Sequence, residues 1–263
     1  MTFAADRNTA EMLNKVPEIT LAFWVIKIMS TTVGETGADY LAVHVGLGAA
    51  VTGGIMAALL IAALLIQLRS RRYVPWIYWL TVVLVSVVGT QITDALTDGL
   101  DVSLYDSTAV FALILAATFA IWYASERTLS IHTIVTKRRE RFYWAAILVT
   151  FALGTAAGDL ATEALSLGFD VGVWVFGGLI AVIAGAYYFG ANAVLTFWLA
   201  YILTRPLGAS LGDLLSQSRP NGGLGIGTVQ TSILFLVVIT ALVTFLSIGA
   251  NRPGIPPKAA EKA

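Results

Sequence analysis

Eight long apolar stretches follow one another along this chain, and they constrain its fold more than any other feature. A helix needs about 20 mostly apolar residues to cross a bilayer. Only 12% of the 263 residues are charged, against about 25% in an ordinary soluble domain. A soluble domain of this length buries about 70–75% of its unfolded surface, too little to hide all eight stretches. We therefore predict an all-α membrane protein with transmembrane helices near residues 17–38, 46–66, 74–96, 107–125, 142–162, 172–189, 192–212 and 226–248.

The basic residues predict how these helices are oriented. Thirteen of the 16 Lys and Arg side chains precede the first span, follow the eighth, or lie between spans two and three or four and five. Loops rich in Lys and Arg face the cytoplasm. Both termini are then cytoplasmic, with residues 1–15 as an N-terminal tail and residues 250–263 as a tail that we predict to be disordered. Ten of the 16 acidic residues gather at the opposite, outer ends of the spans.

A fourfold repeat is the most specific signal in the chain. A Trp is followed ten residues later by Gly and five residues after that by Asp, where roughly 0.02 such matches are expected by chance. Each match lies in an odd-numbered span. The four motifs are Trp24, Gly34 and Asp39; Trp79, Gly89 and Asp94; Trp144, Gly154 and Asp159; and Trp198, Gly208 and Asp213.

Each repeat contains two spans, so all four repeats enter the membrane in the same sense. Parallel repeats of this kind are related by an axis along the membrane normal. We predict eight transmembrane helices from four parallel two-helix repeats, pseudo-symmetric about that axis, with the odd helices around a common centre. A two-by-two grouping fits the sequence equally. The single transmembrane domain covers residues 16–249, with repeats at about 16–69, 73–127, 138–189 and 192–249.

These four motifs make the chain resemble a family of bacterial membrane proteins built from four tandem repeats of unknown function. Each repeat in that family has two transmembrane stretches and a marked tryptophan. The resemblance covers about residues 16–249. It implies a protein of the bacterial inner (cytoplasmic) membrane and implies no particular activity. Repeat four departs most, because Arg205 and Pro206 stand just before Gly208 and predict a different kink in that helix.

The motif aspartates are the first candidates for function. A charge at bilayer depth costs at least about 2.5–3.5 kcal/mol, so such residues are usually functional. Three of the four have a second carboxylate four residues away on the same helical face. Clustered oxygen ligands suit a hard divalent cation. The predicted cation-binding residues are Asp39, Asp94, Asp159, Asp213, Glu35, Asp98 and Glu163.

The same aspartates also have a purely structural interpretation. Each lies 15 residues beyond its Trp, which is about 22 Å along a helix. If the Trp marks the inner membrane interface, each Asp reaches the outer headgroups, where it caps a helix end or is simply solvated.

The other motif positions each leave two interpretations open. Small residues allow close helix packing in membranes, and glycines can also break a helix so that backbone carbonyls face an ion. Tryptophans anchor helices at the membrane interface, and they can also stack on a ligand. The candidates for helix packing or a helix break are Gly34, Gly89, Gly154 and Gly208, and the candidate interface anchors are Trp24, Trp79, Trp144 and Trp198.

Two basic residues fall within spans. Lys27 lies three residues past Trp24, where it can snorkel to the inner surface. Arg205 lies deeper, and we expect it, like Lys27, to take part in an internal ion pair or in a gate below the acidic cluster. His44, beyond Asp39, is a candidate pH or metal contact, and the alternative is a solvated surface histidine.

These observations favour a membrane transporter of a small cation, a divalent metal such as manganese, with coupling to protons. A passive cation channel with an acidic outer vestibule is one alternative. A transporter of a small cationic or neutral organic solute is the other, because Tyr40, Tyr78, Tyr187 and Tyr188 add rings to the tryptophans.

The expected partners follow from the same reading. The lipid bilayer and the small cation are predicted partners. Nucleic acid is not, because the formal net charge is +0. We expect no enzyme activity, since the chain has no Cys and lacks a phosphate-binding loop, a zinc-protease motif and a nucleophile elbow. A bound divalent cation is expected, and no covalent cofactor.

Overall fold

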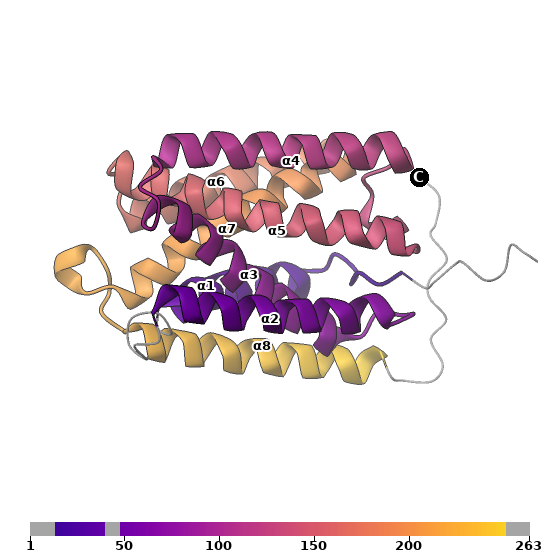
Figure 1. Ribbon diagram of the computed structural model, residues 1–263, viewed down its shortest axis with the longest axis horizontal. Helices are drawn as coiled ribbons and strands as arrows, with labels where there is room; N and C mark the ends of the chain where they lie inside the picture. The colour runs from indigo at the N-terminus through magenta and orange to yellow at the C-terminus, as the bar shows by residue number, and fades with distance from the viewer. Residues whose placement is uncertain (1–13, 40–47, 251–263) are drawn as a thin grey trace, which may run out of the picture.

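The computed structural model describes residues 14–39 and 48–250, and within these ranges every regular element is helical (Figure 1). Seven described helices, α2 to α8, are long and apolar enough to cross a membrane, and α1 has a shorter apolar stretch, Leu21–Gly34. The α-helices are α1 (Leu21–Asp39), α2 (Ala49–Arg69), α3 (Pro75–Thr97), α4 (Leu104–Glu126), α5 (Lys137–Asp159), α6 (Phe169–Tyr188), α7 (Ala193–Ser216) and α8 (Thr228–Ala250). Short helices η2 (Ile131–Thr133) and η4 (Arg219–Asn221) lie in loops, and the π-helix η3 (Leu160–Ala164) extends α5.

Local capping residues decide where several helices begin. Pro75 is the first residue of α3, a position that needs no backbone N–H. The α1 helix begins at Leu21 and not at Pro17, because the Thr20 hydroxyl accepts a hydrogen bond from the Phe23 backbone N–H at 3.3 Å and caps the first turn. The α5 helix begins at Lys137, five residues before the predicted start, because Thr136 caps it in the same way.

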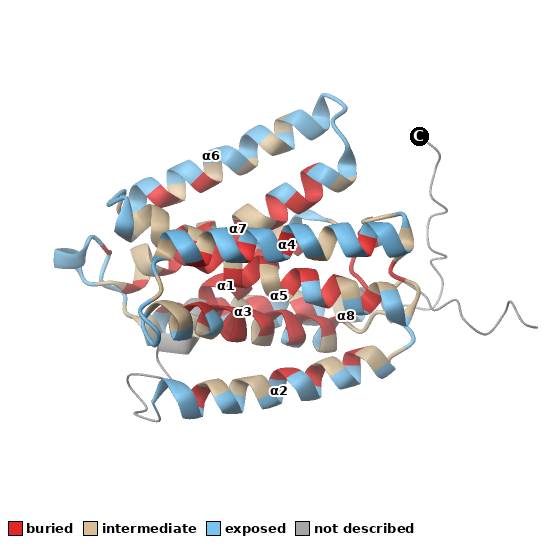
Figure 2. Cartoon of the chain, turned by 45° about the horizontal axis from the view of Figure 1, so that its top comes forward, coloured by how far each residue is buried: buried red, intermediate tan, exposed pale blue. Residues whose placement is uncertain are grey.

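The four odd-numbered helices form a closed ring, which we call the motif ring. Helix α1 packs against α3 and α7, and α5 packs against the same two helices. All four run in one direction, starting from the right of Figure 1. Figure 2 shows that buried residues concentrate on these helices. The motif ring is therefore the protein core.

The four even-numbered helices lie outside the ring. Helix α2 packs on α3, α4 on α5, α6 on α7, and α8 on α1. Each even helix thus covers the odd helix of the following repeat. Their outward faces are apolar and exposed, as Figure 2 shows for α2, α4 and α6. These helices separate the ring from the surroundings.

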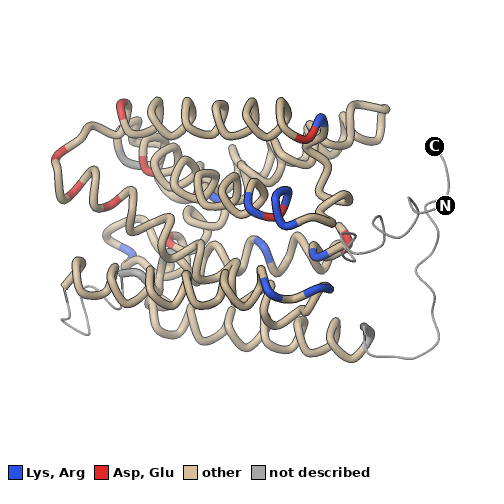
Figure 3. Tube along the Cα trace, turned by 45° about the vertical axis from the view of Figure 1, so that its right-hand side comes forward, with Lys and Arg blue, Asp and Glu red and all other residues tan. Residues whose placement is uncertain are grey.

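Charge is distributed unequally between the two ends of the bundle. Most Lys and Arg residues lie at the end where the odd helices begin, and most Asp and Glu residues lie at the other end (Figure 3). We refer to these as the basic end and the acidic end. The two ends of the described chain, near Asn14 and Ala250, both lie at the basic end. This matches the charge pattern used to orient the predicted spans.

The motif glycines are the points of closest approach between neighbouring ring helices. A Cβ atom would lie 1.9 Å from Ser86 Oγ if it were added at Gly34, 2.6 Å from Phe151 Cβ at Gly89, 2.4 Å from Arg205 Cβ at Gly154, and 2.7 Å from Thr31 Cβ at Gly208. Each contacted residue lies seven positions after the Trp of the next repeat, and repeat four contacts repeat one. The ring helices run unbroken through all four glycines, so these residues serve close packing.

Candidate functional site

An aromatic collar lines the motif ring near the basic end. Each motif Trp packs on an aromatic residue that immediately precedes the Trp of the preceding repeat, with repeat one packing on repeat four. The ring centroids are 5.8 Å apart for Trp24 and Phe197, 5.6 Å for Trp79 and Phe23, 5.5 Å for Trp144 and Tyr78, and 6.3 Å for Trp198 and Tyr143. Contacts at this spacing are worth about 0.5–1.5 kcal/mol each beyond the buried area. The collar therefore helps to close the ring.

The collar places the predicted interface anchors inside the protein. Trp79, Trp144 and Trp198 are buried, whereas Trp24 is half-buried. The Trp198 indole N–H donates to the Leu129 carbonyl oxygen at 3.0 Å. The partner rings were not among the predicted site residues, although a Phe or Tyr precedes every motif Trp and extends the motif by one residue.

Phenol groups join two collar helices. The hydroxyls of Tyr78 and Tyr143 are 2.5 Å apart and share a hydrogen bond between α3 and α5. Just before α3, burial raises the pKa of the Tyr73 phenol, because the charged phenolate would lose its hydration. Both effects keep this part of the ring neutral.

Two cationic side chains are fully buried inside the motif ring, and we call them the central cation pair. Lys27 on α1 and Arg205 on α7 both have 0% exposure. The Lys27 ammonium donates to Thr31 Oγ1 at 3.3 Å and lies 3.8 Å from the ring centroid of Phe151 and 4.4 Å from that of Tyr201. Aromatic faces attract cations electrostatically. Lys27 makes no ion pair with any carboxylate in the described ranges, and it does not snorkel to the surface.

Arg205 connects three ring helices through hydroxyl groups. Its guanidinium donates to Thr90 on α3 and to Thr155 on α5, the latter at 2.7 Å. Each hydroxyl donates in turn to a carbonyl of its own helix, Thr90 to Ser86 at 3.1 Å and Thr155 to Phe151 at 3.0 Å. A threonine hydroxyl that donates in this way accepts from Arg205 through its lone pairs. Arg205, which was predicted to lie deep within its span, therefore occupies a polar site shared by α3, α5 and α7.

Further hydroxyl groups inside the ring have no hydrogen-bond partner among the described residues. They belong to Ser30 on α1, Thr150 on α5 and Tyr201 on α7. Buried polar groups are nearly always satisfied, by water or a ligand where protein groups do not serve. These hydroxyls therefore add polar groups to the buried interior of the described bundle.

The motif aspartates lie towards the acidic end of the ring helices. Asp94, Asp159 and Asp213 are half-buried near the ends of α3, α5 and α7, and Asp98 is exposed. Directly after Asp159, α5 changes into the π-helix η3. Such π-helical turns are frequent at functional sites.

Several predicted ligands cannot be placed. The side chains of Glu35, Asp39 and Glu163 lie outside the described part of the structure, as does His44 entirely. Within the described part, no three His, Asp or Glu side chains come together as metal ligands. The carboxylate cluster therefore stays a prediction.

A buried ion pair closes the basic end of the ring. The Lys15 ammonium lies 2.5 Å from Glu140 Oε2 at the start of α5 and also donates to the Gln67 carbonyl at 3.2 Å near the end of α2. The Gln67 amide donates to Glu140 Oε1 at 3.3 Å. Lys15 is completely buried although it belongs to the segment predicted as an N-terminal tail. This contact ties the start of the chain to two helices.

The fold and site define an internally repeated helical bundle of the kind found in multi-pass membrane proteins, with its polar groups inside. The chain belongs to the family described as Repeat of Unknown Function (DUF347), which matches residues 22–73, 77–128, 142–191 and 196–248. These four matches confirm the predicted fourfold repeat family. No curated protein and no solved structure matches the chain.

Proposed function

We propose that the protein is a transporter of the bacterial inner membrane that carries a small cation, a divalent metal such as manganese, in exchange for protons. All eight helices then span the bilayer, with both termini in the cytoplasm. The four repeats are related by an axis along the membrane normal. Support for this symmetry comes from the glycine and collar contacts, which recur from each repeat to the next and from the fourth to the first.

The observation that carries the proposal is the burial of the central cation pair within a ring of helices that is closed by small residues. Intramembrane charges are expensive, and proteins keep them mainly for ion pathways and coupling. The half-buried aspartates at the acidic end provide carboxylates for a cation that approaches from outside. Deeper in the ring, the hydroxyls of Thr90 and Thr155 hold the Arg205 guanidinium in place.

In this proposal the central cation pair keeps the interior of the ring positively charged while no transported cation is bound. Lysine can exchange its proton when it is buried, whereas arginine stays charged. Lys27 is therefore the residue to carry the coupled proton, and Arg205 the fixed charge that keeps the path closed between cycles.

A carrier explains the interior better than an open channel does. A channel needs a continuous polar path. The aromatic collar packs the ring helices together near the basic end instead. Passage towards the cytoplasm then requires these contacts to separate, which is a step in an alternating cycle.

Flux measurements in proteoliposomes test the proposal. Vesicles loaded with a metal-sensitive dye and a pH-sensitive dye are exposed to Mn²⁺, and metal influx and proton movement are recorded together. We expect Asp94→Asn combined with Asp159→Asn to reduce flux at least about tenfold, which corresponds to about 1.4 kcal/mol in the barrier. Lys27→Met should uncouple proton movement from metal movement.

The matched control is Asp101→Asn, an exposed acid near the same end that lies outside the motif. It should keep full flux. Wild-type vesicles that move neither Mn²⁺, Mg²⁺ nor Ca²⁺, or a double variant with unchanged flux, would contradict the proposal.

A further inference from the structure

A lateral pocket of about 760 Å³ opens between α6, α7 and the start of α1, away from the central cation pair. Its walls come from the last turns of α6, the first turns of α7, the segment before α1 and the loop between α4 and α5. This volume is within the range of about 300–1,000 Å³ that is typical of small-molecule sites.

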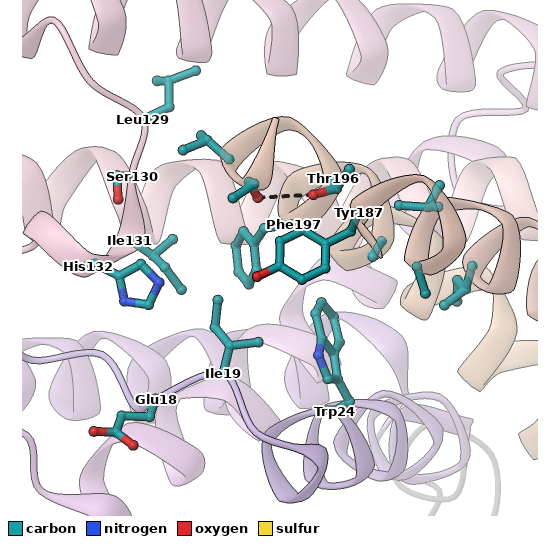
Figure 4. A pocket seen from close by; sticks show the side chains of 16 residues that line it. Glu18, Ile19, Trp24, Leu129, Ser130, Ile131, His132, Tyr187, Thr196 and Phe197 are labelled. Atoms are coloured by element: carbon teal, nitrogen blue, oxygen red, sulfur yellow. Dashed lines mark hydrogen bonds between the residues drawn. The ribbon is translucent and has the colours of Figure 1, made fainter. Parts of the chain in front are cut away.

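The pocket has a polar end and an aromatic interior. Figure 4 shows Glu18, Ser130 and His132 together on one side, with the rings of Trp24, Tyr187 and Phe197 further in. The remaining walls are aliphatic, mainly from isoleucines of α6 and of the two loops. An occupant with a polar head and an apolar body fits this division.

The charge of the lining is negative, in contrast to its surroundings. Glu18 is the one acidic residue of the lining, and none of the lining residues is Lys or Arg. Yet most basic residues of the protein lie at this same end of the bundle (Figure 3). An anionic headgroup would be expected to contact basic side chains, whereas a cation is attracted by a carboxylate and by ring faces.

Trp24 connects this pocket to the repeat motif. The other three motif tryptophans are buried in the collar, but Trp24 is half-buried, contacts Phe197 at 5.8 Å and leaves part of its ring to line the pocket. The indole of Trp24 in the first repeat is therefore available to a ligand, whereas the motif tryptophans of the other three repeats only pack against neighbouring residues.

We infer that this lateral pocket binds an amphiphilic organic cation, with its positive charge near Glu18 and its apolar body against Trp24, Tyr187 and Phe197. The pocket shares Trp24 and Phe197 with the collar but is lined by neither residue of the central cation pair, and a site for an organic cation goes beyond the proposed function. Entry from the inner leaflet follows from the membrane placement proposed above, whereas binding itself does not depend on that placement.

Equilibrium binding of radiolabelled tetraphenylphosphonium to the purified full-length protein in detergent tests the inference. Saturable binding should occur, and the isosteric anion tetraphenylborate should compete at least about tenfold more weakly. Tyr187→Ala and Glu18→Gln should each weaken affinity about fivefold, as expected for the loss of one cation–ring or cation–carboxylate contact. Both side chains are exposed, so neither change should affect folding.

Neighbouring residues provide matched controls. Tyr188 is 87% exposed and lies outside the pocket lining, so Tyr188→Ala should leave affinity within twofold of wild type. Ala184→Trp should fill the pocket and abolish binding, whereas Ala181→Trp on the same helix should not.

Three outcomes would overturn the inference. The first is equal binding of the anion and the cation, and the second is unchanged affinity in both Tyr187→Ala and Glu18→Gln. The third is a phospholipid that native mass spectrometry finds bound to wild type, that Ala184→Trp removes, and that tetraphenylphosphonium does not displace. None of these results depends on metal flux, so the inference and the proposed transport can fail independently.

Discussion

Apolar residues are distributed between the motif ring and the outer helices in the opposite way to the core and surface of a soluble protein. In the most apolar windows of α3, α5 and α7, 50–61% of residues are buried, against 11–22% in α2, α4, α6 and α8. Yet the outer helices are the more apolar of the two sets. The fully buried charges Lys27 and Arg205 and the close contacts of the motif glycines belong to the ring. The difference shows that apolarity here marks the surface, while polar residues mark the interior, as expected for helices that face lipid.

Breaking the buried ion pair on a ring helix should have the largest effect. Glu140→Ala leaves the Lys15 ammonium buried without its carboxylate and should cost about 3–5 kcal/mol of unfolding free energy. On outer helix α4, Glu126 pairs with Arg138 and Arg139, whose side chains are 66% and 23% exposed, so Glu126→Ala leaves no fully buried charge behind and should cost only about 1 kcal/mol. Unfolding by sodium dodecyl sulfate in mixed micelles measures both, and equal losses would remove the distinction.

Adding a charge to an outer helix tests whether that helix faces lipid. Leu113, in the middle of α4, and Leu100, in the loop before it, are both 70% exposed. Leu113→Arg should disfavour membrane insertion by about 3 kcal/mol, because the helix centre faces hydrocarbon, whereas Leu100→Arg should have little effect. A glycosylation-based insertion assay compares the two. Equal insertion would show that α4 does not face lipid.

Glycine substitutions should give opposite signs on the two sets of helices. Gly89→Ala on α3 places a Cβ 2.6 Å from Phe151 Cβ and should cost about 1–3 kcal/mol through overpacking. A Cβ atom added at Gly185 on α6 would meet nothing within 4 Å, so Gly185→Ala should stabilise the helix by about 0.5–1 kcal/mol. The same micelle unfolding assay applies, and a stable Gly89→Ala protein would mean that the ring helices can move apart.

Removing one phenol from the collar should have the smallest effect. Tyr143→Phe loses the hydrogen bond to Tyr78 and should cost about 0.5–1.5 kcal/mol. Tyr123 on α4 is 52% exposed, and Tyr123→Phe should leave stability unchanged. Thermal unfolding in detergent resolves the difference, which should vanish if water replaces the phenol in the collar.

The repeat motif predicted some of the residues of the site and not others. The motif glycines and Arg205 could be singled out from the sequence, because a repeat and a charge within an apolar stretch are both evident along the chain. The aromatic residue that precedes each motif Trp is repeated in the same way and was not predicted. These residues are Phe23, Tyr78, Tyr143 and Phe197. The threonine partners of Arg205 could not be found, because they lie on helices 50 and 115 residues away in sequence.

Apolar length, periodicity and composition were enough to predict the helical class, the approximate helix positions, the fourfold repeat and the unequal charge of the two ends, because each of these properties is evident along the chain. The contacts between repeats could not be predicted in this way: that each repeat packs into the next, that Lys27 and Arg205 share one interior, and that Trp24 lines a pocket. These contacts depend on how the helices are ordered and rotated about the ring, which is set by the packing of the whole bundle.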